Sequence, residues 1–296
     1  MITTSRASKT IPHVVLIILA LACVLPVILL TMASVTDEHA LARDGYGFFP
    51  AVFSMAAYEY IFAAGAVITR AYGISFFVTT VGTFFNIVMT VFLAYPLSRP
   101  EVKGRNVLAF IIFFALLFNG GLVPTFMVYT RILNIRDTIW ALIVPTFLMS
   151  PFLVIMVRNY FRSSIPEEIM EAAKLDGASE VATLLKIVLP ISKPIIGTVG
   201  LMAGIAYWND WTNGLYYLVR RTDLYNIQNV LTNMMNNVQF LRTSAVMQGV
   251  NIELGALPSV SIRMAIAVVG LVPVMIVYPF IQKSFIKGIV IGGIKG

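Results

Sequence analysis

Long apolar runs alternate with shorter polar segments along the chain, and each run has the length of a membrane-spanning helix. A bilayer core about 30 Å thick is crossed by about 20 apolar residues in helical conformation. Because backbone polar groups in lipid must be paired within the span, each run is expected to be helical. The pattern predicts an all-α integral membrane protein with six transmembrane helices, at about 14–33, 73–97, 107–130, 138–157, 194–218 and 262–281.

Composition agrees with this interpretation and excludes several classes of protein. Hydrophobic residues make up 58% of the 296 residues and charged residues 12%, whereas soluble domains have about 45–50% and about 25%. A soluble enzyme, a disordered chain and a nucleic-acid-binding protein are therefore excluded. The single Cys23 lies within an apolar run, and His13 and His39 are far apart, so we expect neither a disulfide within the chain nor a metal site.

No catalytic motif is present in the sequence. The chain has no phosphate-binding loop of the type G-x-x-x-x-G-K-S/T, no G-x-S-x-G and no H-E-x-x-H pattern. We therefore expect no enzyme activity and no cofactor, and any ATP hydrolysis that drives this chain must come from another polypeptide.

The first apolar run has a second interpretation. Arg6 and Lys9 precede it, which is also the pattern of a secretory signal peptide. The run is longer than the apolar region of a signal peptide, which has about 7–15 residues, and no small-x-small cleavage site ends it. We therefore expect a retained helix.

Basic residues near the ends of the runs predict the orientation. With the amino terminus inside, the inner segments hold 13 of the 21 Lys and Arg residues, including all eight lysines. An excess of basic residues marks the cytoplasmic side, so both termini are expected there. The outer segments are then about 34–72, with a short helix expected over 54–60, and about 219–261, which is long enough to carry its own structure or a function.

One inner loop, about 158–193, carries most of the charge. Ser164 followed by Glu167 is a capping-box pattern, and Gly177 can end a helix in the left-handed conformation. A second helix is expected from about Ser179 to Ile187. The loop therefore predicts a helix over 165–175, a glycine turn and a second short helix.

The first helix of this loop has an apolar stripe that includes two alanines. Small side chains permit close approach of another backbone, so the stripe suits insertion into a groove on a partner protein. The alternative is a solvated helical hairpin that covers the end of the helix bundle. The stripe consists of Ile165, Ile169, Ala172 and Ala173.

The loop also contains a spaced motif. Glu171-Ala172-Ala173 is followed by three residues, Gly177, nine residues, Ile187, one residue and Leu189-Pro190. This spacing, after the fourth of six runs, resembles the EAA loop of permease subunits from binding-protein-dependent ABC importers. Further segments resemble carbohydrate-type permeases of the maltose type and their oligosaccharide and polysaccharide subgroup: Phe48-Phe49-Pro50, Asn119-Gly120-Gly121, Trp208-Asn209-Asp210 and 287–296.

The resemblance implies a transport subunit that moves a saccharide by alternating access, driven by a separate ATPase. The helix 165–175 would be the coupling helix, held in a cleft of a cytoplasmic ATPase dimer. A second permease subunit of a different chain and an extracellular or periplasmic solute-binding protein would complete the complex in the bacterial cytoplasmic membrane. The coupling residues implied are Glu171, Ala172, Ala173, Gly177, Ile187, Leu189 and Pro190.

The same resemblance gives a division of the chain. Residues 1–72 would hold the first transmembrane helix and the outer segment, and residues 73–285 would form the core permease domain. Residues 286–296 would form a cytoplasmic tail that reaches the ATPase interface, and the segment 219–261 would touch the binding protein.

Polar residues within or beside the runs are candidates for the substrate pathway. An ionisable residue in a span is a functional hypothesis by default, but Asp210 lies near the outer boundary, where a structural role is equally consistent. The break at Asn119 could expose backbone to a cavity or allow close helix packing. Asn86 could face the pathway or, as we favour, pair with another helix. The candidates are Asn119, Tyr207, Asn209, Asp210 and Asn213.

Three alternatives remain open at this point. An ion-coupled secondary transporter usually needs buried acids deep in the membrane and often has repeated halves. Asp210 is the only acid in the runs from the second onward, and we find no repeat. A membrane scaffold and a permease for a non-sugar solute are also compatible with the runs, but Trp208-Asn209-Asp210 favours carbohydrate.

Overall fold

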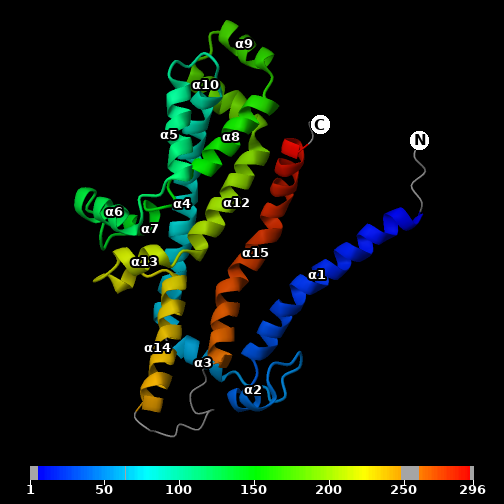
Figure 1. Cartoon of the computed structure of the whole chain (residues 1–296), viewed down its shortest axis with the longest axis vertical. Helices are drawn as coiled ribbons and strands as arrows, with labels where there is room; N and C mark the ends of the chain where they lie inside the picture. Colours follow the sequence, from blue (N-terminus) through cyan, green and yellow to red (C-terminus); the bar gives the residue numbers. More distant parts are fainter. Residues whose placement is uncertain (1–5, 64, 248–259, 294–296) are drawn as a thin grey trace. The chain divides into compact units, whose positions relative to one another are not determined.

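The computed structural model of the chain is helical (Figure 1). It describes residues 6–63, 65–247 and 260–293. Within these residues no strand occurs apart from one isolated bridge between Thr36 and Phe53. The chain divides into two compact units: unit 1 is Met1–Ile68 with Leu231–Pro273, and unit 2 is Thr69–Val230 with Val274–Gly296.

The α-helices follow the apolar runs, but some single runs contain more than one helix. In chain order they are α1 (Arg6–Ser34), α2 (Glu38–Asp44), α3 (Ala56–Ala63), α4 (Gly65–Ser98), α5 (Arg105–Leu117), α6 (Leu122–Met127), α7 (Trp140–Ile143), α8 (Pro151–Ser164), α9 (Glu167–Leu175), α10 (Glu180–Thr183), α11 (Leu189–Ile191), α12 (Lys193–Asn209), α13 (Thr212–Tyr217), α14 (Ile227–Met247) and α15 (Val260–Gly293). Two π-helical segments, η1 (Val128–Ile132) and η2 (Leu184–Val188), and a 3-10 turn, η3 (Thr222–Leu224), lie between them.

Several of these helices are long and apolar enough to cross a membrane. Three qualify alone: Pro12–Ser34 in α1, α4, and Val260–Pro279 in α15. Two bent pairs raise the number to five, namely α5 with α6–η1, bent by 116°, and α10–α11 with α12, bent by 84°. The all-α membrane fold is thus confirmed at this level, and the break expected at Asn119 is the bend between α5 and α6.

The run 138–157 is not a single helix, contrary to the expectation. α7 ends at Ile143 and α8 begins at Pro151, which leaves an unwound segment, residues 144–150. Pro145 and Pro151 have no N–H to continue a helix. Thr146 has a φ of 69°, a conformation that is rare for a β-branched residue, and the Phe147 N–H bonds the Pro145 carbonyl across it at 2.7 Å. The hydropathy pattern depends on side chains and carries no information on the backbone N–H groups that the two prolines lack. It therefore could not reveal this break.

The outer segment expected at 34–72 contains α2 and α3, which belong to unit 1, and the first turns of α4. α3 overlaps the short helix expected over 54–60, while α2 was not expected. Asp37 Oδ1 begins α2 by accepting the His39 and Ala40 N–H groups at 3.0 and 3.3 Å. The buried Glu38 carboxylate accepts the backbone N–H groups of Val260 and Ser261 at 2.9–3.1 Å. This carboxylate therefore caps the first turn of α15.

Unit 2 has two apolar clusters, one toward each of its ends. Figure 1 shows α9 and α10 at one end of the unit and α7 and α13 nearer the other. The first cluster joins α4, α8, α9, η2 and α12 through residues such as Val91, Tyr95, Val157, Met170 and Val188. The second joins α4, α7, α12 and α13 through Val78, Leu142, Tyr207, Tyr217 and Leu218.

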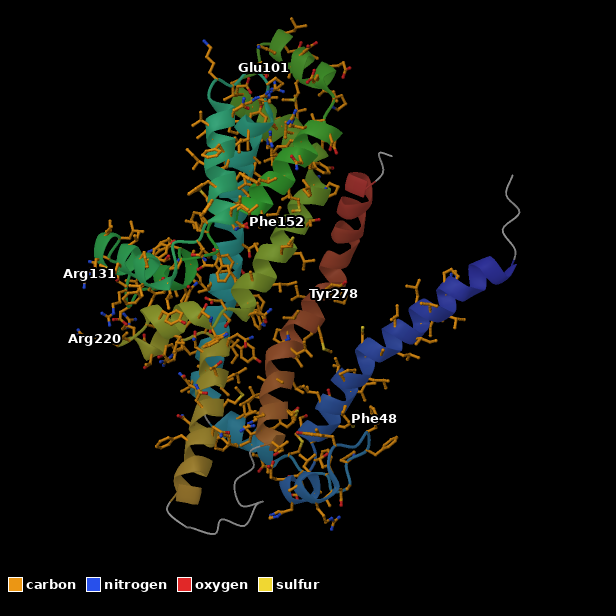
Figure 2. All side chains as sticks on the ribbon, in the orientation of Figure 1. Phe48, Glu101, Arg131, Phe152, Arg220 and Tyr278 are labelled. Atoms are coloured by element: carbon orange, nitrogen blue, oxygen red, sulfur yellow. The ribbon has the colours of Figure 1, made fainter. Side chains whose placement is uncertain are left out.

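Exposed side chains on the long helices are largely apolar (Figure 2). Leu16 in α1 is 63% exposed, Phe76 in α4 61% and Phe110 in α5 65%. Many large apolar side chains exposed on one helix mark a membrane or protein interface. Two sequence expectations lie partly outside the described residues. The segment 219–261 contains α14 but its residues 248–259 are not described, and α15 continues into the expected tail as far as Gly293.

Candidate functional site

α9 has the charge pattern of an isolated surface helix. Glu167 and Glu168 lie in its first turn and Lys174 in its last turn, which suits the positive amino-terminal and negative carboxy-terminal ends of the helix dipole. The expected helix over 165–175 is therefore found, shortened to Glu167–Leu175.

The capping box expected at the start of α9 is not formed. α8 continues to Ser164, so this residue is the last of one helix and not the cap of the next. Pro166 takes the cap position, without a side-chain hydrogen bond. As a consequence, the loop expected to begin at residue 158 begins only after Ser164. We use "the α9–α11 segment" for residues 165–191.

The expected apolar stripe of α9 divides into two faces. Ile165 and Met170 are buried in the cluster at this end of unit 2, and Ala173 is buried too. Ile169 and Leu175 are exposed by 38% and 88%, and Ala172 is exposed as well. The expectation that the four stripe residues share one contact face is therefore wrong. We call Ile169, Ala172 and Leu175 the exposed face of α9.

Gly177 ends α9 in the left-handed conformation, as its position predicts. Its φ is 73°, and no atom lies within 4 Å of a Cβ built there, so the backbone angle and not a lack of space requires glycine. The Gly177 N–H donates to the Lys174 carbonyl at 3.2 Å and the Ala178 N–H to the Ala173 carbonyl at 3.0 Å. This pair of bonds is a Schellman motif, which satisfies the last carbonyls of the helix.

The second helical stretch begins where the sequence predicts and runs further. Ser179 caps it by accepting the Ala182 N–H at 3.2 Å, and α10, η2 and α11 then continue without a gap to Ile191. Pro190 has no N–H for the Lys186 carbonyl, and the turn before it widens into the π-helical η2. Ile187 and Leu189 are half-buried, while Pro190 is exposed.

A cavity of about 370 Å³ lies between α9 and the turn that joins α4 to α5. Glu167, Glu171 and Lys174 line it from α9, and Arg99 and Glu101 line it from the turn. Arg99 and Glu101 pair with each other at 3.4 Å. Glu171 is exposed and forms no ion pair within the described part of the chain. Its carboxylate is therefore available to a group from outside the chain.

Two side-chain bonds tie the end of α4 to the helices around this cavity. The Tyr95 hydroxyl donates to Glu180 Oε2 at 2.6 Å, and Arg158 Nε donates to the Leu97 carbonyl at 3.1 Å. Sequence reasoning missed both bonds. Tyr95 lies within an apolar run, and no local signal connects it with a carboxylate 85 residues later.

At the other end of unit 2, the unwound segment receives three buried donors. The Tyr207 hydroxyl bonds the Ile143 carbonyl at 2.8 Å, and Asn213 Nδ2 bonds the Pro145 carbonyl at 3.2 Å. Asn86 Nδ2 bonds the Phe147 carbonyl at 2.6 Å. These bonds satisfy carbonyls that an unbroken helix would have paired internally. The favoured expectation, that Asn86 pairs with another helix, holds only in part, because its partner carbonyl belongs to the unwound segment.

Asp210 acts as a cap in the break between α12 and α13. Its Oδ1 accepts the Thr212 N–H at 3.0 Å, the Thr212 hydroxyl at 2.7 Å and the Asn213 N–H at 3.2 Å. Its own carbonyl accepts Asn226 Nδ2 at 2.6 Å. Asp210 is 5% exposed, and its contacts are those of a structural residue. A pathway role for it stays a prediction.

Of the other pathway candidates, Asn119 and Asn209 are exposed. Asn119 Oδ1 accepts the Gly121 N–H at 2.9 Å in the bend between α5 and α6. Asn209 is the last residue of α12. The structure thus brings Tyr207, Asp210 and Asn213 together around the unwound segment and leaves Asn119 and Asn209 at the surface, where their pathway role stays a prediction.

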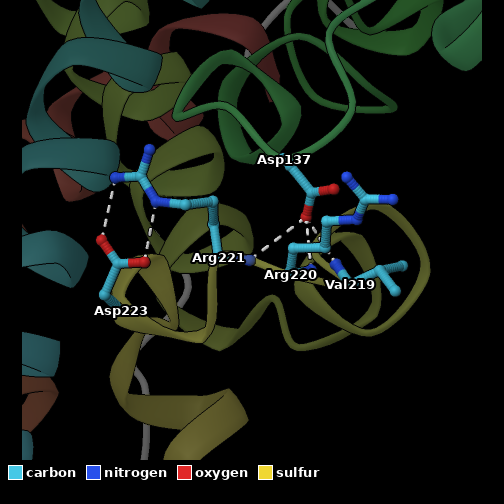
Figure 3. Close-up of polar contacts among 5 residues, drawn as sticks. All are labelled: Asp137, Val219, Arg220, Arg221 and Asp223. Carbon is cyan, nitrogen blue, oxygen red and sulfur yellow. Dashed lines mark hydrogen bonds and ion pairs between the residues drawn. The ribbon is translucent and has the colours of Figure 1, made fainter.

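Asp137 is a further residue with a structural role that sequence reasoning missed. Its Oδ1 accepts three successive backbone N–H groups, from Val219, Arg220 and Arg221, at 2.7, 2.8 and 3.3 Å (Figure 3). Hydrogen bonds to the charged form, that of Arg220 first, hold the pKa of Asp137 below its usual range. Its own N–H donates to the Tyr217 carbonyl at 3.1 Å. Asp137 therefore fastens the start of α7 to the end of α13.

Three arginines of unit 2 are exposed. Arg221 pairs with Asp223 at 2.8 Å (Figure 3), and Arg131 and Arg220 are exposed as well (Figure 2).

Comparison with known proteins adds a family and three informative similarities. The model of the family "Binding-protein-dependent transport system inner membrane component" matches residues 71–291. The chain is 37% identical over 273 residues to protein LplC of Bacillus subtilis, covering 92% of this chain and 90% of that protein. It is 38% identical over 284 residues to the polygalacturonan/rhamnogalacturonan transport system permease protein YtcP of the same organism, covering 95% and 96%.

A solved structure is also similar. It is the crystal structure of a bacterial ABC transporter involved in the import of the acidic polysaccharide alginate. One of its chains superposes with a TM-score of 0.77 at 28% sequence identity, over 96% of this chain and 100% of that chain.

Proposed function

Because the chain belongs to the family of inner-membrane components of binding-protein-dependent transport systems, we propose that it forms the membrane passage of a saccharide importer. Membership confirms the expected identity as an ABC importer permease that is not itself an enzyme. It removes the alternatives of an ion-coupled secondary transporter and a scaffold. The cargo we propose is an oligosaccharide or polysaccharide, since the similar proteins are named for polygalacturonan, rhamnogalacturonan and alginate.

The α9–α11 segment is the proposed contact with the ATPase. The single observation that carries this proposal is the exposed face of α9, an apolar surface of Ile169, Ala172 and Leu175 on a helix whose carboxy-terminal end is closed by the Schellman motif. Apolar residues at 88% and 38% exposure on a short charged helix suit insertion into a groove of another protein. Glu171 beside them offers a carboxylate to a basic group of the partner.

The spacing of the motif supports the same assignment. Gly177 permits the Schellman turn, Ile187 and Leu189 are half-buried, and Pro190 accompanies the π-helical turn before the bend into α12. We assign these three elements to the frame that holds α9, and Glu171 and Ala172 to direct contact with the ATPase. Ala173 is buried and packs α9 onto the bundle.

The wider assembly follows from the family and from the distribution of charge. We infer a dimer of ATPase subunits, a second permease of a different chain and an external solute-binding protein as partners. We infer six crossings with both termini in the cytoplasm, the fourth crossing being α7, the unwound segment and α8 together. The basic residues of the inner segments support this orientation.

One pair of substitutions at one position tests the contact with the ATPase. Ala172→Glu places a bulky charge on the exposed face of α9, whereas Ala172→Ser keeps the residue small. We expect Ala172→Glu to reduce copurification of the ATPase subunit and ATP-driven uptake at least tenfold, and Ala172→Ser to leave both near wild type. Normal copurification with Ala172→Glu would overturn the proposed contact.

The cargo is tested separately by uptake measurements. Cells or proteoliposomes that contain the complete transporter would be offered labelled galacturonan oligosaccharides, neutral oligosaccharides, an amino acid and phosphate. Uptake of a saccharide is expected. Uptake of the amino acid or phosphate with no saccharide uptake would establish the non-sugar alternative.

A further inference from the structure

One hydrogen bond joins the α9–α11 segment to a membrane-spanning helix through side chains. The Tyr95 hydroxyl, near the end of α4, donates to Glu180 Oε2, in the first turn of α10. The oxygen–oxygen distance is 2.6 Å, within the range of about 2.5–2.7 Å for a hydroxyl bonded to a carboxylate, which is roughly twice as strong as a neutral hydrogen bond. The bond spans 85 residues of sequence.

The two partners differ in their surroundings. Tyr95 is 7% exposed and belongs to the apolar cluster that also contains Met170 of α9. Glu180 is exposed. A buried tyrosine hydroxyl needs a polar partner, and Glu180 supplies it from the edge of the cluster. The α4 end of this contact is therefore buried in the cluster, and the Glu180 end belongs to the segment that carries α9.

The position of Glu180 in the chain connects it closely with α9. Only the Gly177 turn and the Ser179 cap separate the last residue of α9 from Glu180, and both are held by hydrogen bonds. Glu180 also begins the helical stretch that bends by 84° into α12. Glu180 is thus connected to α12 along the chain and to α4 through its bond with Tyr95.

The cavity beside α9 increases the share of the connection between α9 and α4 that the Tyr95–Glu180 bond provides. Close-packed side chains transmit displacement because interiors have low compressibility. Here the charged side of α9 and the turn after α4 are separated by about 370 Å³ of open space. Across this space α9 and the turn do not pack against each other, so α9 is joined to α4 through the apolar cluster that contains Met170 and Tyr95 and through the Tyr95–Glu180 bond at its edge.

We propose that Tyr95 and Glu180 are positioning residues that transmit the displacement of α9 to α4 during transport. This inference rests on the proposed function, because it needs an ATPase that moves α9. The bond gives ATP-driven motion a discrete path into the second membrane-spanning helix, as energetic coupling through contiguous contacts requires.

The test measures how much cargo is imported per ATP hydrolysed, in proteoliposomes that contain the complete transporter and its binding protein. Tyr95→Phe removes only the hydroxyl. Tyr160→Phe is the matched control, because Tyr160 is also 7% exposed and belongs to the same apolar cluster. We expect Tyr95→Phe to lower the import-to-ATP ratio about fivefold or more, the lower bound of a typical coupling energy, with ATPase association unchanged. Tyr160→Phe is expected to keep the wild-type ratio.

Glu180→Gln and Glu180→Ala provide an independent test at an exposed position, where folding is not at risk. Both are expected to lower the same ratio, and the double variant Tyr95→Phe with Glu180→Gln is expected to lower it no further than the stronger single variant. A merely structural role would lower import and ATP hydrolysis in proportion and leave the ratio unchanged, which would overturn the inference.

The failure of the inference and the failure of the proposed function are distinguishable. If the wild-type chain binds no ATPase subunit, the proposed function fails, and the inference fails with it. If the wild-type complex couples import to hydrolysis and all variants keep its ratio, only the inference fails.

Discussion

The α9–α11 segment and the unwound segment both interrupt helices of unit 2, but their polar groups are satisfied in different ways. In the α9–α11 segment the helix ends are closed by neighbouring residues, through the Schellman turn at Gly177 and the cap at Ser179. In the unwound segment the carbonyls are bonded by buried side chains from distant elements, namely Asn86, Tyr207 and Asn213.

The difference shows what each interruption is suited to do. A break that is closed locally needs nothing from the rest of the fold, so the exposed face of α9 is free for a partner. A break that is closed by three buried donors is held in place by the core of the unit. We therefore expect substitutions at the unwound segment to affect folding, and substitutions in the α9–α11 segment to affect association and coupling.

Gly82→Val tests how firmly the core holds the unwound segment, and it has the largest expected effect on stability. A Cβ at Gly82 would lie 2.5–2.7 Å from ring atoms of Tyr207, whose hydroxyl is fixed on the Ile143 carbonyl. Overpacking of this kind costs about 1–3 kcal/mol, and loss of the hydroxyl bond adds to it. A lower midpoint of thermal unfolding in detergent is expected.

Gly73→Val is the matched control for this experiment. It lies in the same helix, α4, and a Cβ there meets no atom within 4 Å. The unfolding midpoint of Gly73→Val is expected to stay near that of the wild type. If Gly82→Val unfolds at the same temperature as Gly73→Val, the view that the core fixes Tyr207 and the unwound segment is wrong.

Gly177→Ala tests the α9–α11 segment, and its expected effect on stability is smaller. A non-glycine residue in the left-handed conformation costs about 1–2 kcal/mol, and the cost falls on a turn at the edge of the unit. We expect little change in the unfolding midpoint but a clear loss of ATP-driven uptake, because the frame of α9 is strained. Loss of folding without a separate loss of uptake per folded molecule would contradict the comparison.

Asp137→Asn is expected to have the smallest effect on stability, and this effect is expected to depend on pH. The pKa of Asp137 is lowered in the folded protein by the backbone N–H groups of residues 219–221, so its stabilising contribution is present above the unfolded pKa of about 3.9. This contribution is lost as pH falls through the lower folded pKa. The stability difference between wild type and Asp137→Asn is therefore expected to shrink as pH is lowered from about 6 to about 3. A difference that grows on acidification would contradict the assigned bonds.

The sequence predicts the α9–α11 segment better than the unwound segment, and the reason is physical. The roles of Gly177 and Ser179 depend on local backbone chemistry, which a few neighbouring residues determine. The stripe of α9 was assigned wrongly because Ala172 and Ala173 are adjacent on the helix, and only the packing of the unit decides which of them is buried.

At the unwound segment, the apolar pattern continues through Pro145 and Thr146 as if the helix did. The three donors that permit the break are separated by 61, 64 and 68 residues from the carbonyls that they bond. Asp137 is similarly joined to backbone groups 82–84 residues later. Such pairs carry no signal in a single sequence, because each partner is an ordinary polar residue in its own surroundings.

The central claim is that the exposed face of α9 lies against an ATPase subunit in the working transporter. Leu175 is 88% exposed in the chain alone, so a cysteine placed there in a Cys23→Ser background reports directly on that face. The rate at which a thiol reagent labels Leu175→Cys would be measured with and without the ATPase subunits. We predict rapid labelling of the chain alone and strong protection in the complex, whereas equal labelling in a transport-competent complex would contradict the proposed contact.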